Sequence, residues 1–310
     1  MLVVDKLIEI DVDAVNGNVI PYKDHYLLIG NDSYQRRHTY LYTLSSDFQP
    51  VGEGTFLSRN NYEDHRVIFN QETSFICCNY SGGVTMCSGE LNHASRTLNV
   101  EHVNSQNFTM KKREKNWCPF VDKGEVHVVY SLYPELVILR KDNKNGYERI
   151  FSEKSAYFHR WVAENVDLLE AVHIGGGSNF IKYGNLFIGT FHVKYVDLEY
   201  RSFVAFIAPD FSVKKIIGID YGDSLFQGKR LRKLRAELVR DETASTFFVA
   251  PYRLRLRKVV FASGIFLKEN NFYISIGIND LVTKVAIFRK DKIDAVIESF
   301  SGKWKRPEIG

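Results

Sequence analysis

The 310-residue sequence lacks any apolar run of the about 20 residues that a membrane-spanning helix requires. Its first residues, MLVVDKLIEIDVDAV, carry acids at positions 5, 9, 11 and 13, so the cationic start and unbroken apolar stretch of a secretion signal are missing. Cysteine is scarce, because the chain has only four, and none of them has CxxC spacing. These absences predict a cytoplasmic chain with buried free thiols, no membrane span, no metal site and no cofactor.

The net charge of +4 is unevenly distributed along the chain. Residues 229–258 contain ten Lys or Arg and three Asp or Glu, a balance of +7 that leaves −3 for the remainder. Proteins that bind nucleic acid through such segments usually add exposed aromatic residues on a platform, and this stretch has few. The pattern therefore favours a solvated face or a contact with an anionic substrate over nucleic-acid binding.

Five segments of the chain read alike, near residues 16–50, 63–92, 116–142, 176–210 and 261–291. Each has a short strand-like run, a hairpin turn, an aromatic-rich run such as HYLLIG or NLFIGTF, a polar turn and a third run. Repeated antiparallel meanders of this kind are typical of propeller blades. We predict an all-β fold, a five-bladed β-propeller in one domain over 1–310, with a β-sandwich as the alternative.

Helical patterns are rare in the sequence. Only two stretches, FHRWVAENVDLL near Phe158 and RLRKLRAELVRD near Arg230, read as helices. The second places Leu231, Leu234 and Leu238 on one face, with basic residues around the rest. It lies within the basic stretch, so we expect a basic helical insertion over 225–258.

Polar residues at equivalent positions of different blades meet in a propeller, because the innermost strand of every blade lines the central channel. The stretch EDHR, residues 63–66, begins such a strand, and Asp64 and Arg66 alternate there with both side chains facing the channel. Asn116, Ser178 and Ser263 take equivalent places in other blades. The residues that follow the second strands are expected to rim the same funnel: Tyr80, Tyr130, His192, Asn279 and Asp280.

Each candidate also has a structural interpretation. An Asp-x-Arg pair often forms an ion pair or anchors a turn, and His192 fits a hydrogen-bonded inward-facing histidine. Asp280 fits a residue that shapes a tight turn. The run GGGS, residues 175–178, lacks the Lys-Ser/Thr and the following helix of a phosphate-binding loop.

Four motifs, in order, resemble the blade motifs of five-bladed β-propellers related to β-mannoside phosphorylases. They are EDHR, EKNWCPFVDKGEVHVVYSLYP, GGGSNFIKYGNLFIGTFHV and FASGIFLKENNFYISIGINDLVTKVAIF, and the resemblance covers roughly residues 16–290. The group includes mannosyltransferases and glycosyltransferase-like proteins. Its usual Glu-Asp-Pro-Arg motif has His65 in place of the proline here.

The resemblance implies a role for each matching residue. Asp64 corresponds to the proton donor, Arg66 to a phosphate or sugar contact, and Asp280 to a carboxylate that holds sugar hydroxyls. His192 matches the histidine of a Tyr-His-Gly motif, although Phe191 and Val193 flank it here. Lys115, Asn116 and Trp117 fall in the Glu-Lys-Asn-Trp motif of the glycosyltransferase-like relatives.

The chemistry of these residues fits the resemblance. An inverting hydrolase needs two carboxyl groups about 6.5–9.5 Å apart. A phosphorylase or transferase works with one carboxyl group, because phosphate or a nucleotide sugar supplies the other reactive group and cationic side chains hold it. One Asp amid Arg, Lys and His resembles the second arrangement, and Trp117, Tyr80 and Tyr130 offer flat faces for sugar rings.

We therefore expect an enzyme that makes or breaks glycosidic bonds with inversion, as a glycosyltransferase or glycoside phosphorylase acting on mannosides or related hexoses. Its partners would be a sugar or glycan and inorganic phosphate or a sugar nucleotide. The alternative is a non-catalytic propeller that binds glycans or a protein partner.

Overall fold

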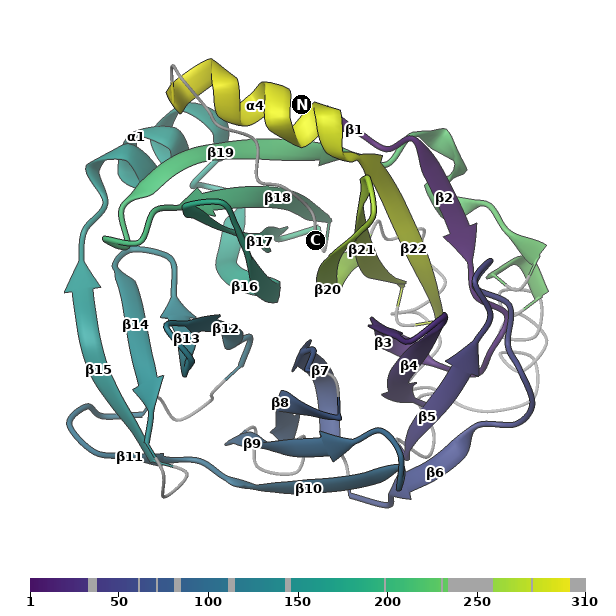
Figure 1. Cartoon of the computed structure of the whole chain (residues 1–310). Coiled ribbons are helices and arrows are strands. Elements are labelled where there is room, and N and C mark those ends of the chain that lie inside the picture. Colours follow the sequence, from purple (N-terminus) through teal and green to yellow (C-terminus); the bar gives the residue numbers. More distant parts are fainter. Residues whose placement is uncertain are drawn as a thin grey trace, which may run out of the picture.

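The computed structural model describes residues 1–32, 38–60, 62–70, 72–80, 85–110, 115–142, 146–197, 199–229, 231–233, 259–279 and 281–301. The chain forms a five-bladed β-propeller, as predicted, with five sheets arranged around one axis (Figure 1). Short runs rich in β-branched and aromatic residues, broken by hairpin turns, make the consecutive strands of each blade an antiparallel meander.

Each blade begins at the axis and runs outward. In that order, blade 1 consists of β3 (Val15–Tyr22), β4 (His25–Asn31), β5 (Thr39–Leu44) and β6 (Thr55–Ser58), and blade 2 consists of β7 (Tyr62–Ile68), β8 (Thr73–Tyr80), β9 (Thr85–Asn92) and β10 (Thr97–His102). Blade 3 consists of β12 (Cys118–Asp122), β13 (Glu125–Ser131), β14 (Leu136–Lys141), β15 (Gly146–Glu153) and β11 (Asn104–Ser105). Blade 4 consists of β16 (Ala171–Tyr183), β17 (Leu186–Tyr195), β18 (Tyr200–Ile207), β19 (Val213–Asp220) and β1 (Leu2–Val3), and blade 5 consists of β20 (Val260–Lys268), β21 (Asn271–Ile278), β22 (Val282–Arg289) and β2 (Lys6–Glu9).

The segments singled out in the sequence contain the three inner strands of each blade, whereas the fourth strands lie outside them. Strand β10, for example, reads TLNVEH, and none of its residues is fully buried. Such an outer strand has one solvated face and carries little apolar signal. The repeat therefore stands out in the sequence only where the strands are buried.

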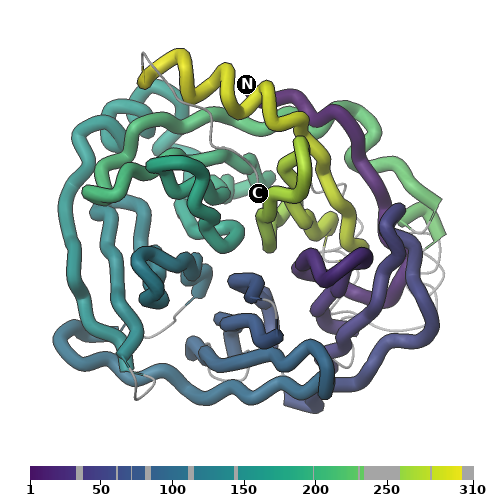
Figure 2. Tube along the Cα trace, in the orientation of Figure 1, coloured from purple at the N-terminus to yellow at the C-terminus, as the bar shows by residue number. Residues whose placement is uncertain are grey.

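The N-terminal strands close the ring. Strand β2 pairs antiparallel with β22 and completes blade 5, while β1 adds a parallel strand to β19 of blade 4. Figure 2 shows this N-terminal segment running beside blade 5. Residues from the two ends of the described chain thus share one sheet, and their pairing closes the ring of blades.

Helices lie at the periphery. The first predicted helix is confirmed as α1 (Ala156–Asn165), where the Ser155 hydroxyl accepts a hydrogen bond from the Phe158 N–H at 3.2 Å. Of the second, Leu231–Lys233 are helical, and Arg230 and 234–258 lie outside the described residues. Between blades 4 and 5 stands a short 3₁₀ helix, η1 (Asp223–Phe226).

The C-terminal helix α4 (Lys290–Ser301) corrects the prediction that only two stretches are helical. It follows β22 without a loop, and it buries Ile293 and Ile297, four residues apart, against the outside of the ring (Figure 1). This four-residue spacing is the apolar stripe of a surface helix. The charged Arg-Lys-Asp run at its start has the composition of a turn, which hides the helix in the sequence.

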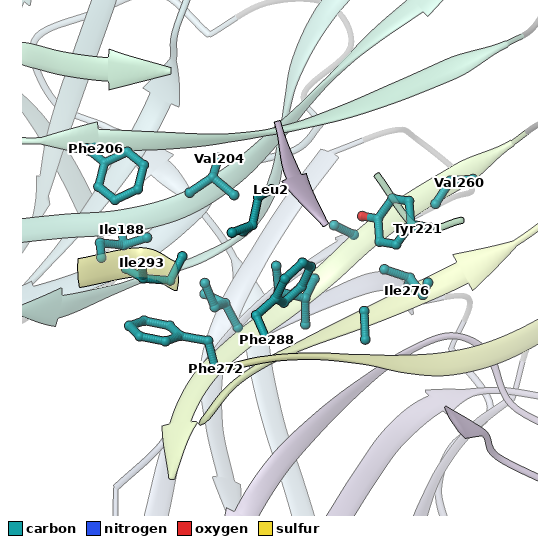
Figure 3. Packing of buried hydrophobic residues seen from close by; sticks show 14 of the residues in the cluster. Leu2, Ile188, Val204, Phe206, Tyr221, Val260, Phe272, Ile276, Phe288 and Ile293 are labelled. Atoms are coloured by element: carbon teal, nitrogen blue, oxygen red, sulfur yellow. The ribbon is translucent and has the colours of Figure 1, made fainter. Parts of the chain in front are cut away.

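The hydrophobic core consists of five clusters, each between two neighbouring blades. Figure 3 shows part of the cluster between blades 4 and 5, where Val204, Phe206, Phe272 and Phe288 pack with Ile293 of α4. All four cysteines are buried free thiols, as predicted. Within the described ranges, every helix is too short or too polar to span a lipid bilayer.

Candidate active site

Strand β7 carries a bulge at the motif EDHR. Glu63 faces Asn79 and Arg66 faces Cys77, so that Asp64 and His65 together oppose a single residue. Asp64 has a φ of 54°, in the left-handed region that few residues other than glycine adopt, and aspartate is among those that tolerate it. The bulge interrupts the regular alternation of side-chain directions that the sequence predicted for this strand. Asp64 and Arg66 therefore need not point to the same side.

Arg66 is fully buried, and its guanidinium donates to three other parts of the molecule. Nε donates to the carbonyl of Gly177 in blade 4 at 2.6 Å, and Nη2 donates to Asn116 Oδ1 at 3.0 Å. Nη1 donates to the backbone carbonyl of Asp64. The ring of Phe261 lies below the guanidinium, at 5.0 Å from its carbon to the ring centroid.

These contacts join blades 2, 3, 4 and 5 through one side chain. Because Arg66 bonds the carbonyl of Asp64 and not its carboxylate, the Asp-x-Arg motif acts as a turn anchor in the structure. A buried guanidinium that is bonded in this way stabilises the site from the protein interior.

The carboxylate of Asp64 is half-buried and receives a hydrogen bond from the side chain of Asn79, with 2.9 Å between Nδ2 and Oδ2. Asn79 itself is buried, at the end of β8. Among the described residues no hydrogen bond reaches Asp64 Oδ1. The protein thus fixes one of the two carboxylate oxygens, Oδ2.

His192 lies near the end of β17 and is buried. Its ring is 5.4 Å from the Phe261 ring, 5.2 Å from Tyr200 and 6.0 Å from His173, between centroids. Burial, with a smaller contribution from His173, lowers the pKa of His192 to about 3, so the imidazole is neutral. Its Nδ1 has no hydrogen-bond partner in the described structure.

Asn116 has a φ of 64° and stands just before β12 of blade 3. A Cβ atom added at Gly176 would lie 2.3 Å from the Asn116 carbonyl oxygen and 2.3 Å from Cys118 Sγ. Only glycine allows this approach. The run GGGS therefore brings β16 of blade 4 against blade 3, and it lies in a strand and not in a phosphate-binding loop.

Three further predicted residues lie beneath or beside this cluster. Trp117 is fully buried, and its ring meets Tyr130 and Tyr147 edge-on at 5.5 and 5.2 Å between centroids. Ser178 is also fully buried, donating to the Asn179 carbonyl at 2.6 Å. Tyr130 is half-buried. Asp280 lies outside the described residues.

The inner strands are tied together by residues that the sequence did not indicate. Asn18 of blade 1 donates to the Ser263 carbonyl of blade 5 at 2.7 Å and to the His65 carbonyl of blade 2 at 3.3 Å. Asn79 and Phe261 were also missed as site residues. Asn79 directly precedes Tyr80, which was expected at the rim, so its place at the end of a second strand was the available signal.

Known structures share this fold. A β-1,2-mannobiose phosphorylase from Listeria innocua, in complex with β-1,2-mannobiose, is 14% identical with a TM-score of 0.58, over 93% of this chain and 92% of that one. A glycosyl hydrolase from Bacteroides ovatus is 11% identical with a TM-score of 0.59, over 91% and 86%. A GH43 β-1,3-galactosidase with galactodeoxynojirimycin is 12% identical with a TM-score of 0.50, over 93% and 94%. At these identities the likeness shows the fold alone. No protein-family model and no curated protein matches the sequence.

Proposed function

We propose that this protein is a carbohydrate-active enzyme that makes or breaks a glycosidic bond at the propeller axis, with Asp64 as its general acid or base. The observation that carries the proposal is the state of the Asp64 carboxyl group. It is half-buried, it stands on a strained bulge, and Asn79 holds one of its oxygens at 2.9 Å. Left-handed backbone at a non-glycine residue is a feature that clusters at functional sites.

Asp64 would act through Oδ1. In bond cleavage the protonated carboxyl group gives its proton to the departing glycosidic oxygen as the bond to the sugar C1 breaks. In synthesis the carboxylate takes the proton from the acceptor hydroxyl that attacks C1. In either direction the incoming group approaches from the face of the sugar opposite the leaving group, which gives inversion.

Arg66 would support this reaction by positioning the groups that it bonds. Its guanidinium bonds both the Asp64 carbonyl and the Asn116 amide, and so fixes the backbone that carries the reacting carboxyl group. Asn116, neutral His192, Tyr130 and Asp280 are the proposed contacts for sugar hydroxyls and ring faces. Trp117 and Ser178 support the site from the core, where both are fully buried.

Within this class we propose a glycoside phosphorylase or glycosyltransferase for mannosides or related hexoses. The mannobiose phosphorylase that shares the fold supports this choice. The incoming phosphate or sugar nucleotide would have to bind cationic side chains other than Arg66, because the Arg66 guanidinium already donates its hydrogen bonds to protein acceptors.

A second candidate is a propeller that binds glycans without catalysis. It is favoured by one observation, the complete burial of Arg66, Trp117 and Ser178, which leaves fewer reactive groups at the axis than the sequence suggested.

A screen of the purified protein tests the proposal. Hexose 1-phosphates and nucleotide sugars would be offered with a panel of mannose, glucose and galactose acceptors, and released phosphate or nucleotide would be measured. The enzyme proposal predicts turnover with at least one pair. Saturable glycan binding without turnover for any pair would support the binding propeller instead.

A further inference from the structure

A pocket opens on the same face of the propeller as the candidate active site. It has a volume of 260 Å³ and lies between blades 4 and 5, where the start of β18, the end of β19 and the helix η1 meet the start of β20. Strand β18 starts directly after the turn that ends β17, and His192 lies on that end of β17. The pocket is therefore on the outer side of His192.

A chain of ring contacts connects the pocket to the axis. The Arg66 guanidinium lies 5.0 Å from the Phe261 centroid, Phe261 is 5.4 Å from His192, and His192 is 5.2 Å from Tyr200. Tyr200 lines the pocket. Because the buried side chains of Phe261 and His192 are packed between the two places, one sugar ring cannot occupy both, and a ligand that does so has at least two units.

The lining combines flat apolar surfaces with groups that bond hydroxyls. Aromatic rings come from Tyr200, Phe203, Tyr221 and Phe226. Polar side chains also line it, namely Glu199, Arg201, Ser202 and Asp220. Arg201 is exposed and bonds Glu199 Oε1 through Nε at 3.2 Å. Rings that face sugar C–H groups, with carboxylates as acceptors and a guanidinium as donor, are what a sugar needs.

The charge and the size of the pocket narrow the range of possible ligands further. The carboxylates of Glu199 and Asp220 line the pocket together with the guanidinium of Arg201, so its charged side chains have no positive excess that would favour phosphate or another anion. Its 260 Å³ lies below the range of about 300–1,000 Å³ that is usual for drug-sized ligands. A single neutral monosaccharide unit fits both limits.

We infer that this pocket, which we call the blade-4 pocket, is a distal subsite for a neutral hexose unit of an oligosaccharide whose reacting bond lies at the axis. The inference depends on the proposed function only in taking the axis as the reacting centre. Binding of a hexose in the blade-4 pocket can be measured without any turnover.

Gly218 allows the pocket to be closed by one substitution. It lines the pocket, and an added Cβ would lie 3.7 Å or more from its nearest neighbours, Phe203 and Met1. Gly218→Ala is therefore expected to fit without strain, whereas Gly218→Leu fills the space. Melting temperatures of both variants would establish that they fold.

The experiment is a titration of the full chain, labelled at Ile, Leu and Val methyl groups, followed by NMR. Mannose, glucose, galactose and inorganic phosphate are the probes. We expect at least one hexose to shift the methyl signals of Ile219, Leu225 and Val260, which line the pocket, and to leave the buried Ile76 unchanged. Gly218→Leu should weaken this binding by about tenfold or more, because the leucine side chain fills the pocket. Gly218→Ala should keep it.

The inference would be overturned if no hexose shifted the pocket methyl signals at any concentration up to the solubility limit of the sugar. It would also be overturned if phosphate shifted these signals and no hexose did. The third contrary result is a Gly218→Leu variant that binds hexose like the parent. Repeating the titration on Asp64→Asn separates the two proposals. If Asp64→Asn keeps full turnover while the pocket methyls still respond, the proposed function fails and the subsite stands. If turnover is lost but no hexose moves the pocket methyls, the subsite fails alone.

Discussion

The Asn79 amide holds the Asp64 carboxylate, with 2.9 Å between Nδ2 and Oδ2, and so ties the candidate acid to the neighbouring strand of its own blade. Asn79 pairs with Glu63 across β7 and β8, one residue before the bulge. The buried amide Oδ1 has no hydrogen-bond partner in the described structure. If the amide were flipped, that oxygen would accept a hydrogen bond from the O–H of a protonated Asp64, so Asn79 can bond both states of the acid.

The first prediction concerns Asn79→Leu, which removes the amide and keeps the volume. A hydrogen bond to a charged group contributes about 1.5–3 kcal/mol, so turnover should fall about 10- to 100-fold. Asn79→Ser, which keeps a donor, should recover part of the rate. An unchanged rate for Asn79→Leu would show that the bond has no part in the reaction.

The second prediction concerns Arg66→Lys. An ammonium group cannot reproduce the planar contacts to the Gly177 carbonyl and Asn116 Oδ1, and each buried acceptor left unpaired costs about 1–3 kcal/mol. The free energy of unfolding should fall by that amount or more in urea titration. Arg201→Lys is the matched control, because Arg201 is exposed and should change stability little. Equal stability of Arg66→Lys and the parent would refute the anchoring role.

The third prediction concerns Trp117→Phe. Because the indole is fully buried against Tyr130 and Tyr147, the smaller ring leaves a cavity that should cost about 1–3 kcal/mol of stability. Sugar affinity should stay within twofold or so of the parent value, since no contact with ligand is lost. A selective loss of sugar binding at unchanged melting temperature would instead make Trp117 a ligand contact.

The fourth prediction concerns pH and His65, whose ring nitrogens are buried without hydrogen-bond partners in the described structure. Burial lowers the pKa of His65 from 6.5 to about 3. Below pH 6.5 the unfolded chain therefore binds a proton that the folded chain refuses until about pH 3, and stability is lost as the pH falls through this window.

His65→Leu removes that proton and the unpaired nitrogens together. Its melting temperature should exceed that of the parent, and the difference should widen between pH 6.5 and pH 4 because only the parent has the buried imidazole. Thermal melts across that range measure it. A constant difference at all pH values would mean that His65 is not protonated on unfolding.

The sequence predicted the parts of the fold that repeat. Inner strands such as β17 are buried along their length and therefore carry a dense apolar pattern. Strand β2 pairs with β22 from the other end of the chain, a partner that no local pattern indicates. Helix α4 was hidden by the charged turn-like start that follows β22.

Part of the arrangement of the candidate site follows from the sequence, whereas its function stays a prediction. The EDHR motif and the blade equivalence placed Asp64 and Asn116 near one axis, and Arg66 joins them there. The burial of Arg66 could not be foreseen, because its acceptor Gly177 belongs to another blade and the bulge depends on backbone geometry. Asp280 lies outside the described residues and stays a prediction.

The most direct test of the account is the turnover of Asp64→Asn, measured with the substrate pair that the screen identifies. The substitution keeps the shape and the bond to Asn79 while removing the ionisable proton, so the rate should fall about 10²- to 10⁴-fold at unchanged melting temperature and similar sugar affinity. An Asp64→Asn protein that folds, binds and turns over like the parent would contradict the central claim that this carboxyl group carries the chemistry.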